Sequence, residues 1–255
     1  MQPLAYVEQG RGTPVVLVHA FPLSSAMWQA EAGWLADRAR VITPDLFGFG
    51  RSPRLEPPSI SGMATGVLEL LDRLAPRQPV VLGGLSMGGY VAFEVMRQAP
   101  QRVKGLALCS TRAAADTSAQ RQGRLELIQR IRREGFDAAA QAKRLLGPTT
   151  LASRAAVVER VTQLIRSATP EGISDALLAM ANRRDSTGLL GSIACPTLVI
   201  AAEEDAVIPM AESVAMAAAI PGAKIERIAA SGHLVNLEQP APFRAALEPF
   251  LRLLY

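Results

Sequence analysis

The stretch Gly84-x-Ser86-x-Gly88 constrains the fold of this chain more than any other part of its sequence. It follows Val80–Leu82, a β-branched apolar run typical of a buried strand, and precedes Val91–Arg97, a run typical of a helix. A chain that turns so sharply from strand to helix strains its central residue and leaves no room for a Cβ two positions away. The alternative is an ordinary glycine-rich turn, but the flanking strand and helix favour a nucleophile elbow that presents Ser86.

Apolar runs alternate with helical patterns on both sides of this elbow, which predicts an α/β fold with a mostly parallel sheet covered on both faces. Besides the elbow strand, we expect strands over Leu4–Glu8, Pro14–His19, Arg40–Pro44, Val103–Cys109, Thr197–Ala201 and Lys224–Ile228. Besides the elbow helix, we expect helices through Met27 to Leu35 and over Met63–Leu74, Ala211–Ala219 and Pro242–Leu254.

The alternation stops between about Ala113 and Gly188, where only helical periodicity is found. Leu125, Ile128 and Ile131 form one apolar stripe, and a second runs from Val157 to Ile165. Thr169 followed by Pro170 marks another helix start. We therefore expect one domain whose α/β core consists of residues 1–112 and 189–255, with residues 113–188 inserted between strands as a helical cap.

Composition and charge exclude several classes of protein. The chain has 255 residues, of which 49% are apolar, yet no apolar run is long enough to cross a membrane. The N-terminus lacks the basic and apolar regions of a signal peptide, so we expect a cytoplasmic protein without a membrane partner. A net charge of +4 without a dense basic tract argues against nucleic-acid binding.

Cysteine and histidine are too few and too scattered to suggest a metal site. Cys109 and Cys195 match no metal or redox spacing, and each lies beside an apolar run, so we expect free, buried thiols. His19 and His233 are the only histidines, so any chemistry that needs an imidazole must use one of them. We expect no metal and no other cofactor.

Reactive side chains follow four of the expected strands. Ser86 follows the elbow strand, His19 an earlier strand, Glu203-Glu204-Asp205 the Thr197 strand, and Ser231-Gly232-His233 the Lys224 strand. Ligands of parallel sheets bind beyond the carboxyl ends of the strands. The chain order serine, acid, histidine is the order expected of a hydrolase with a nucleophile elbow.

These motifs make the whole chain resemble an α/β-hydrolase-fold enzyme. His19-Ala20-Phe21-Pro22 is similar to the oxyanion loop of that family, and Asp45-x-x-Gly48-x-Gly50-x-Ser52 to its D-x-x-G-x-G-x-S loop. Pro196–Asp205 is similar to its acid-bearing strand, and Gly232-His233 with Glu238-Gln239-Pro240 to its histidine loop. Ala20 departs from the pattern, because glycine is usual there. The elbow sequence looks like that of small bacterial carboxylesterases, and the layout also resembles 3-oxoadipate enol-lactonases and cofactor-free haloperoxidase/perhydrolases.

The resemblance implies a catalytic triad of Ser86, His233 and Asp205. Because a serine hydroxyl is a poor nucleophile at neutral pH, His233 has to accept its proton during attack, while Asp205 holds one imidazole tautomer. Glu203 and Glu204 are alternative candidates for the carboxylate of the triad, and Asp205 is preferred because the family motif ends there. A serine nucleophile argues against haloalkane dehalogenases and epoxide hydrolases, which use aspartate, and against dienelactone hydrolases, which use cysteine.

The resemblance also implies an oxyanion hole made by the backbone N–H groups of Phe21 and Met87. His19 is expected to brace the oxyanion loop without taking part in the reaction. The nearest carboxylate after the Val103 strand, Asp116, is expected to be a helix cap.

The substrate pocket is less constrained by the sequence. Phe21, Leu23, Met87 and Trp28 are candidates for its lining, although the helix spacing of Trp28 and Trp34 favours core packing. Pro22 follows the oxyanion donor, as in perhydrolase-like relatives. Arg112 stands just past a strand end and is a candidate for contact with substrate. Further arginines of the insertion either attract an anionic substrate or form a solvated helix face: Arg121, Arg124, Arg130, Arg132 and Arg133.

Four functions are consistent with these residues. The first is a serine carboxylesterase acting on small, short-acyl esters through an acyl-enzyme. An enol-lactonase with the same triad is the second, and perhydrolase or haloperoxidase activity with peroxide is the third. A non-catalytic ligand receptor, a role this fold has in plants, is the remote fourth. The expected partner is a small-molecule ester, and the sequence does not indicate an oligomeric state.

Overall fold

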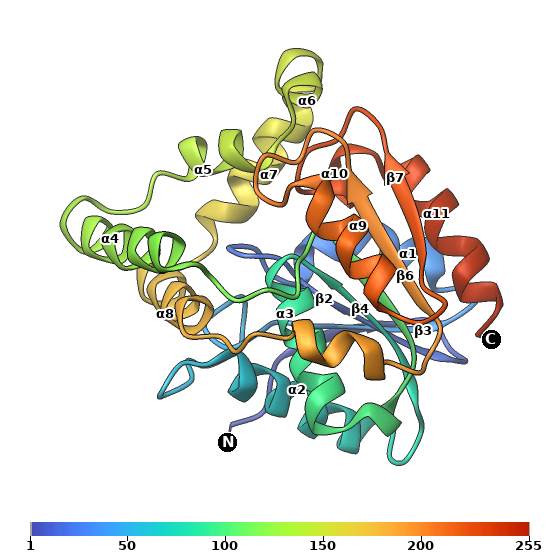
Figure 1. Cartoon of the computed structure of the whole chain (residues 1–255). Helices are drawn as coiled ribbons and strands as arrows, with labels where there is room; N and C mark the ends of the chain where they lie inside the picture. Colours follow the sequence, from blue (N-terminus) through green and yellow to red (C-terminus); the bar gives the residue numbers. More distant parts are fainter. Residues whose placement is uncertain (1, 255) are drawn as a thin grey trace.

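The computed structural model describes residues 2–254, and its centre is a seven-stranded sheet (Figure 1). The strands lie in the order β1-β3-β2-β4-β5-β6-β7. β1 pairs with β3 in the antiparallel direction and all other neighbours are parallel, which confirms the predicted mostly parallel sheet. The strands are β1 (Tyr6–Gln9), β2 (Pro14–Val18), β3 (Arg40–Pro44), β4 (Val80–Leu85), β5 (Val103–Cys109), β6 (Thr197–Ala202) and β7 (Lys224–Ile228).

Helices cover both faces of the sheet and connect its strands. The α-helices are α1 (Gln29–Leu35), α2 (Ile60–Leu74), α3 (Met87–Gln98), α4 (Ser118–Glu134), α5 (Ala138–Leu145), α6 (Pro148–Ser153), α7 (Ala155–Arg166), α8 (Pro170–Ala181), α9 (Met210–Ala219), α10 (Val235–Glu238) and α11 (Pro240–Arg252). Three short 3₁₀ helices are η1 (Ser25–Trp28), η2 (Pro100–Arg102) and η3 (Thr187–Ser192).

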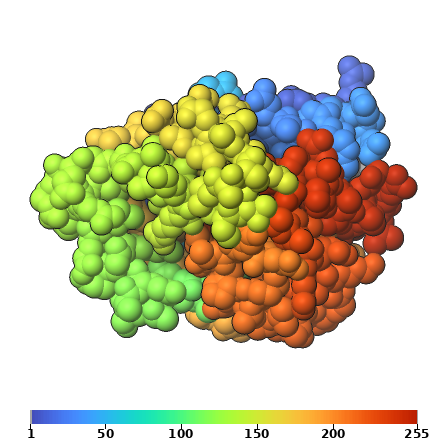
Figure 2. Space-filling view, turned by 90° about the horizontal axis from the view of Figure 1, so that it is seen from above, coloured from blue at the N-terminus to red at the C-terminus, as the bar shows by residue number. Residues whose placement is uncertain are grey.

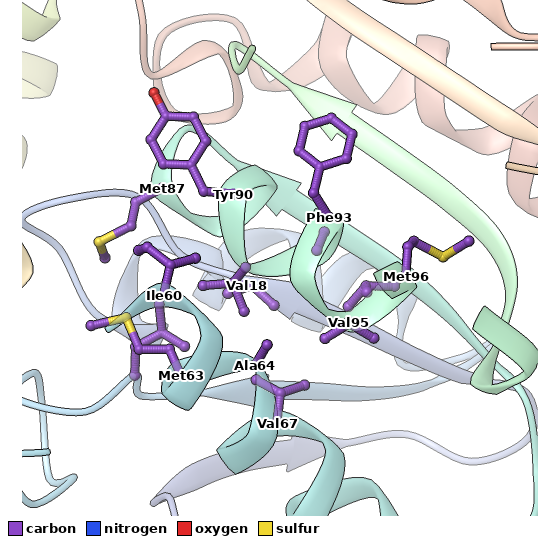
Figure 3. Close-up of a cluster of buried hydrophobic side chains, with 14 of the residues drawn as sticks. Val18, Ile60, Met63, Ala64, Val67, Met87, Tyr90, Phe93, Val95 and Met96 are labelled. Carbon is purple, nitrogen blue, oxygen red and sulfur yellow. The ribbon is translucent and has the colours of Figure 1, made fainter. Parts of the chain in front are cut away.

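The sheet separates two hydrophobic clusters because successive strand residues point to opposite faces. In β2, Val16 and Val18 belong to one cluster, whereas Val15 and Leu17 belong to the other. The first cluster packs beneath α2 and α3, where Val18 meets side chains of both helices (Figure 3). The second packs beneath α1 and α11. A strand buried on both faces reads as a continuous apolar run, which is why these strands stand out in the sequence.

Most expected elements are present, with shifts of a few residues at their ends. The first strand begins at Tyr6 because Leu4 is buried in the core ahead of it. The α2 helix begins at Ile60, three residues before its expected start, because the Ser59 side chain accepts a hydrogen bond from the Gly62 amide. The helix expected through Met27 and Leu35 is divided into η1 and α1, since Ser24 caps a 3₁₀ turn before α1 starts.

Between β5 and β6 the described chain forms helices and no strand. Helices α4 to α8 project from one end of the sheet, with α4, α5 and α8 at the left of Figure 1 and α6 and α7 at its top. In pairs they pack on one another, α4 against α8 and α5 against α7. Seen from above, this segment (green to yellow) meets the chain that follows β6 (orange) (Figure 2). It is the stretch in which the sequence has only helical periodicity.

Both cysteines are free, as expected, but they differ in burial. Cys109 lies at the end of β5 and is buried, which raises the pKa of its thiol to about 12. Cys195 is only half-buried. No helix within residues 2–254 is long and apolar enough to cross a membrane.

Candidate active site

Ser86 occupies the sharp turn between β4 and α3. Its backbone has φ +56° and ψ −112°, a conformation that side-chain-bearing residues rarely adopt. A Cβ on Gly84 would overlap the Gly88 carbonyl, and one on Gly88 would overlap the Val18 carbonyl. The Ser86 amide donates to the Cys109 carbonyl at 2.9 Å, which continues the pairing of β4 with β5 up to the turn. Strain of this kind persists only where the surrounding structure enforces it, and here both glycines and both strands do so.

His233 and Asp205 come together from the loops after β7 and β6. Asp205 Oδ2 lies 2.8 Å from His233 Nδ1, and both side chains are almost fully buried. The other carboxylate oxygen, Oδ1, accepts hydrogen bonds from the amides of Val207 (2.8 Å) and Ile208 (2.9 Å). Because an ionised carboxylate only accepts, Nδ1 carries the proton and Nε2 is left as the basic nitrogen.

The two glutamates beside Asp205 have other surroundings. Glu203 is exposed. Glu204 turns toward α6, where its carboxylate accepts hydrogen bonds from the Thr149 amide (3.0 Å) and from the Thr149 hydroxyl. Of the three carboxylates that the sequence offers, only Asp205 is hydrogen-bonded to His233.

His19 holds the loop that carries Phe21. Its Nδ1 donates to the Ala20 carbonyl at 3.0 Å, and its Nε2 accepts from the Leu46 amide at 2.9 Å. Full burial lowers the pKa of His19 to about 4, so the ring is neutral at pH 7 and suits both bonds. The expected bracing contacts are therefore present, and they tie the loop after β2 to the loop after β3.

The two backbone amides expected to form the oxyanion hole come from separate parts of the chain. Met87 is the first residue of α3, and the first amides of a helix have no carbonyl partner within it. Phe21 lies in the loop after β2 and lines the same cavity as Ser86. Ala20, where the resembling family has glycine, is fully buried among apolar side chains, so its methyl group is accommodated.

A cavity of about 290 Å³ lies over Ser86, between the strand ends and the helical segment. Four predicted site residues line it: Phe21, Ser86, Arg112 and His233. Its other lining includes apolar side chains of α4, α5, α8 and the loop after β6, among them Leu127, Leu145, Leu177, Met180 and Ile208. Its small volume and its mixture of apolar and polar side chains suit a small organic molecule with a polar group.

Four candidate lining residues do not reach this cavity, so that part of the prediction was wrong, although the core packing favoured for Trp28 is confirmed. Pro22, Leu23 and Trp28 are buried outside it. The Trp28 ring packs on Phe243 of α11, with centroids 6.0 Å apart, because η1 turns its apolar side toward the second cluster. Met87 instead points into the first cluster, beside Ile60 and Met63 (Figure 3).

Asp116 is not a helix cap, contrary to expectation. Thr117 caps α4, and the Asp116 carboxylate is buried among three arginines. It accepts from Arg112 at 2.7 Å, Arg183 at 2.7 Å and Arg124 at 2.5 Å. Hydrogen bonds and charge from Arg124 and Arg183 lower the pKa of Asp116, although burial opposes this shift. Arg183 comes from far along the chain, so no local pattern could have revealed this cluster.

Glu238 is a buried carboxylate whose role the sequence did not indicate. Its Oε2 accepts from the amides of Gly232 (3.0 Å) and Gly147 (2.9 Å), and its Oε1 accepts from the Leu234 amide (3.1 Å). Together with a 2.9 Å bond from the His233 amide to the Leu145 carbonyl, these contacts fix the histidine loop. The motif Glu238-Gln239-Pro240 was the available signal, but its partners are set by the fold.

Comparison with known proteins places this architecture among hydrolases. Residues 13–240 match the family model described as alpha/beta hydrolase fold. A thermophilic esterase from Thermogutta terrifontis, solved with malate bound, is 43% identical with a TM-score of 0.93, over 98% of this chain and 93% of that one. An enol-lactonase from Burkholderia xenovorans LB400 is 25% identical with a TM-score of 0.89, over 98% and 96%. A putative carbamate hydrolase, RutD, from Azorhizobium caulinodans is 30% identical over 97% of this chain and 94% of its own length.

Proposed function

The chain belongs to the α/β-hydrolase family, and on that basis we propose that it is a serine carboxylesterase acting on small esters with short acyl groups. One observation carries the proposal. Ser86, strained at the elbow, and His233, hydrogen-bonded to Asp205 at 2.8 Å, line one small cavity. The esterase from Thermogutta terrifontis supports the same class of reaction by its similarity over nearly the whole chain.

In the first half of the reaction the Ser86 hydroxyl attacks the ester carbonyl. His233 Nε2 takes the hydroxyl proton, and Asp205 stabilises the imidazolium that results. The oxyanion is held by the amides of Phe21 and Met87, a type of contact worth about 10²–10³ in rate per donor. His233 then gives the proton to the departing alcohol, which leaves an acyl group on Ser86.

In the second half a water molecule takes the place of the alcohol. His233 Nε2 removes a proton from the water as it attacks the acyl carbonyl, and the same two amides stabilise the second oxyanion. Collapse of this intermediate returns the proton to Ser86 and releases the carboxylic acid. No metal or cofactor enters either half of this cycle.

The proposed cap consists of residues 113–188. Its helices α4, α5 and α8 supply part of the cavity wall opposite Ser86. Because the cavity measures about 290 Å³, near the lower end of the range for ligand pockets, we infer a small acyl group.

The test is hydrolysis of p-nitrophenyl esters from acetate to dodecanoate by wild type and by the Ser86→Ala variant. We expect turnover on short chains that the substitution abolishes. An organophosphonate should label the wild type and not the variant. Labelling that persists in Ser86→Ala, or absence of both turnover and labelling in a folded wild type, would contradict the proposal.

A lactonase is the second candidate, favoured by the similarity to the Burkholderia xenovorans enol-lactonase. The proposed triad would open a lactone through the same acyl-enzyme, since a lactone is a cyclic ester. A phosphonate-reactive protein that turns over enol-lactones but no p-nitrophenyl ester would select this candidate.

A further inference from the structure

The cavity over Ser86 carries an unusual amount of positive charge. Arg112, Arg124 and Arg144 line it, and no aspartate or glutamate from residues 2–254 does so. These arginines come from three separate parts of the chain. Arg112 follows β5, Arg124 lies on α4 and Arg144 lies on α5. The fold thus gathers three guanidinium groups around one small space.

Little of this charge is compensated within the protein. The guanidinium groups of Arg112, Arg124 and Arg183 share a single carboxylate, that of Asp116, so the two of them that line the cavity have only part of one negative charge between them. Arg144 adds a further charge, and it makes no hydrogen bond or ion pair with any residue that the structure describes. Arg144 is exposed and therefore partly solvated, but Arg112 is buried and Arg124 half-buried, and a cavity lined by these three cations without a carboxylate favours an anion.

The arginines of the cavity differ in what they contact within the protein. Arg112 is only 7% exposed, and its guanidinium group donates to Asp116 and Gln120. Burial and the charge of Arg124 lower the pKa of Arg144, so these two cations repel one another. An anion placed between them would relieve the repulsion and form charge-assisted hydrogen bonds.

We propose that the substrate ester carries an anionic group, most simply a carboxylate, which Arg144 and Arg124 bind while the ester carbonyl lies at Ser86. Arg112 provides further positive charge beside the same group. This inference rests on the proposed function, because it concerns the esters that the Ser86 site hydrolyses. The carboxylate belongs either to the acyl part or to the alcohol part of the ester, and the experiment separates the two.

The test compares pairs of esters in which one member carries a free carboxylate and the other has that carboxylate blocked as a methyl ester. Monomethyl and dimethyl esters of succinate, glutarate and adipate place the carboxylate on the acyl side, and 3-acetoxypropionate and its methyl ester place it on the alcohol side. Proton release in a pH-stat gives kcat/KM for each ester, halved for the dimethyl esters because they have two equivalent bonds, and chromatography of the products shows which bond is cleaved in methyl 3-acetoxypropionate. We expect the wild type to prefer the anionic member of at least one pair by about tenfold or more, roughly the effect of one charge-assisted hydrogen bond.

Two variants on the same helix assign the preference to Arg144. Arg144→Gln should lower the ratio of anionic to neutral kcat/KM about tenfold, whereas Lys143→Gln, which removes an exposed charge outside the cavity, should leave it unchanged. Arg144→Lys should retain part of the preference. Glutarate should inhibit hydrolysis of p-nitrophenyl butyrate more weakly in Arg144→Gln than in wild type, and thermal melting checks that each variant is folded.

The outcomes distinguish this inference from the proposed function. If the wild type hydrolyses neutral esters and reacts with phosphonate but shows no charge preference in any pair, only the anion site is refuted. A preference that survives in Arg144→Gln would also refute it. If no ester of either charge is hydrolysed and Ser86 is not labelled, the proposed function itself fails.

Discussion

Replacing Glu238 by glutamine should destabilise the fold, although it exchanges only one carboxylate oxygen for an NH₂ group. The carboxylate is fully buried and accepts three backbone hydrogen bonds, two through Oε2 and one through Oε1. If the amide oxygen takes the Oε2 position, the NH₂ group faces the Leu234 amide and that bond is lost. A hydrogen bond to a charged group contributes roughly 1.5–3 kcal/mol, and the other two weaken as the charge disappears.

We therefore expect Glu238→Gln to cost about 3 kcal/mol of unfolding free energy, and Glu238→Ala to cost more, because three buried donors lose their acceptor. For a chain of this length 3 kcal/mol corresponds to a fall in Tm of roughly 6–12 °C. Urea unfolding of wild type and variants measures the cost, with the exposed Glu203→Gln as the matched control. A change in Glu238→Gln below about 0.5 kcal/mol, the range of ordinary surface substitutions, would refute the reasoning.

In Asp205→Asn the amide oxygen should stay on the Val207 and Ile208 amides, so the NH₂ group faces His233 Nδ1. Because this NH₂ group can only donate, it forces the proton onto His233 Nε2. Steady-state kinetics on p-nitrophenyl acetate should therefore show that kcat falls on the order of 10⁴-fold. Glu204→Gln should keep most of the activity, and the opposite pattern would assign the acid to Glu204. The unfolded chain takes up a proton at His19 as the pH falls below about 6.5, whereas the folded chain does so only near pH 4, so stability should decline across this window. Comparing urea unfolding of wild type and His19→Asn between pH 7 and pH 4 should reveal a contribution of about 3 kcal/mol, and equal pH slopes would contradict it. EDTA should leave ester hydrolysis unchanged, and a rate that depends on added metal would contradict the mechanism.

The parts of the fold that local chemistry dictates were predictable from the sequence. Strands buried on both faces appear as apolar runs, and β3 and β5 have the expected ends. Gly84 is needed because its Cβ would meet the Gly88 carbonyl, a constraint contained within a few residues, whereas the constraint on Gly88 comes from the Val18 carbonyl of β2. The mostly parallel sheet and the helical segment follow from the same local patterns.

The parts set by contacts between distant segments were not predictable in the same way. Asp116 stands one residue before the N-cap of α4 and has the residue type of a cap. Its carboxylate instead accepts a hydrogen bond from Arg183, which lies 67 positions away. The helix spacing of Trp28 favoured core packing, which is confirmed, but its partner Phe243 on the last helix could not be predicted from any local pattern. The same holds for Glu238 and its bond to Gly147, since neither residue has a local pattern that indicates the other.

The contacts of residues 145–149 have a consequence for recombination between relatives. Leu145, Gly147 and Thr149 are hydrogen-bonded to His233, Glu238 and Glu204, so the end of α5 and the start of α6 are joined to the loops that follow β6 and β7. A crossover that replaces this stretch without its partners would break bonds on both sides of the exchange. Chimeras that alter substrate preference should therefore keep residues 145–149 with the parent that supplies the histidine loop, and an exchange of α4 should include Asp116, the partner of Arg124.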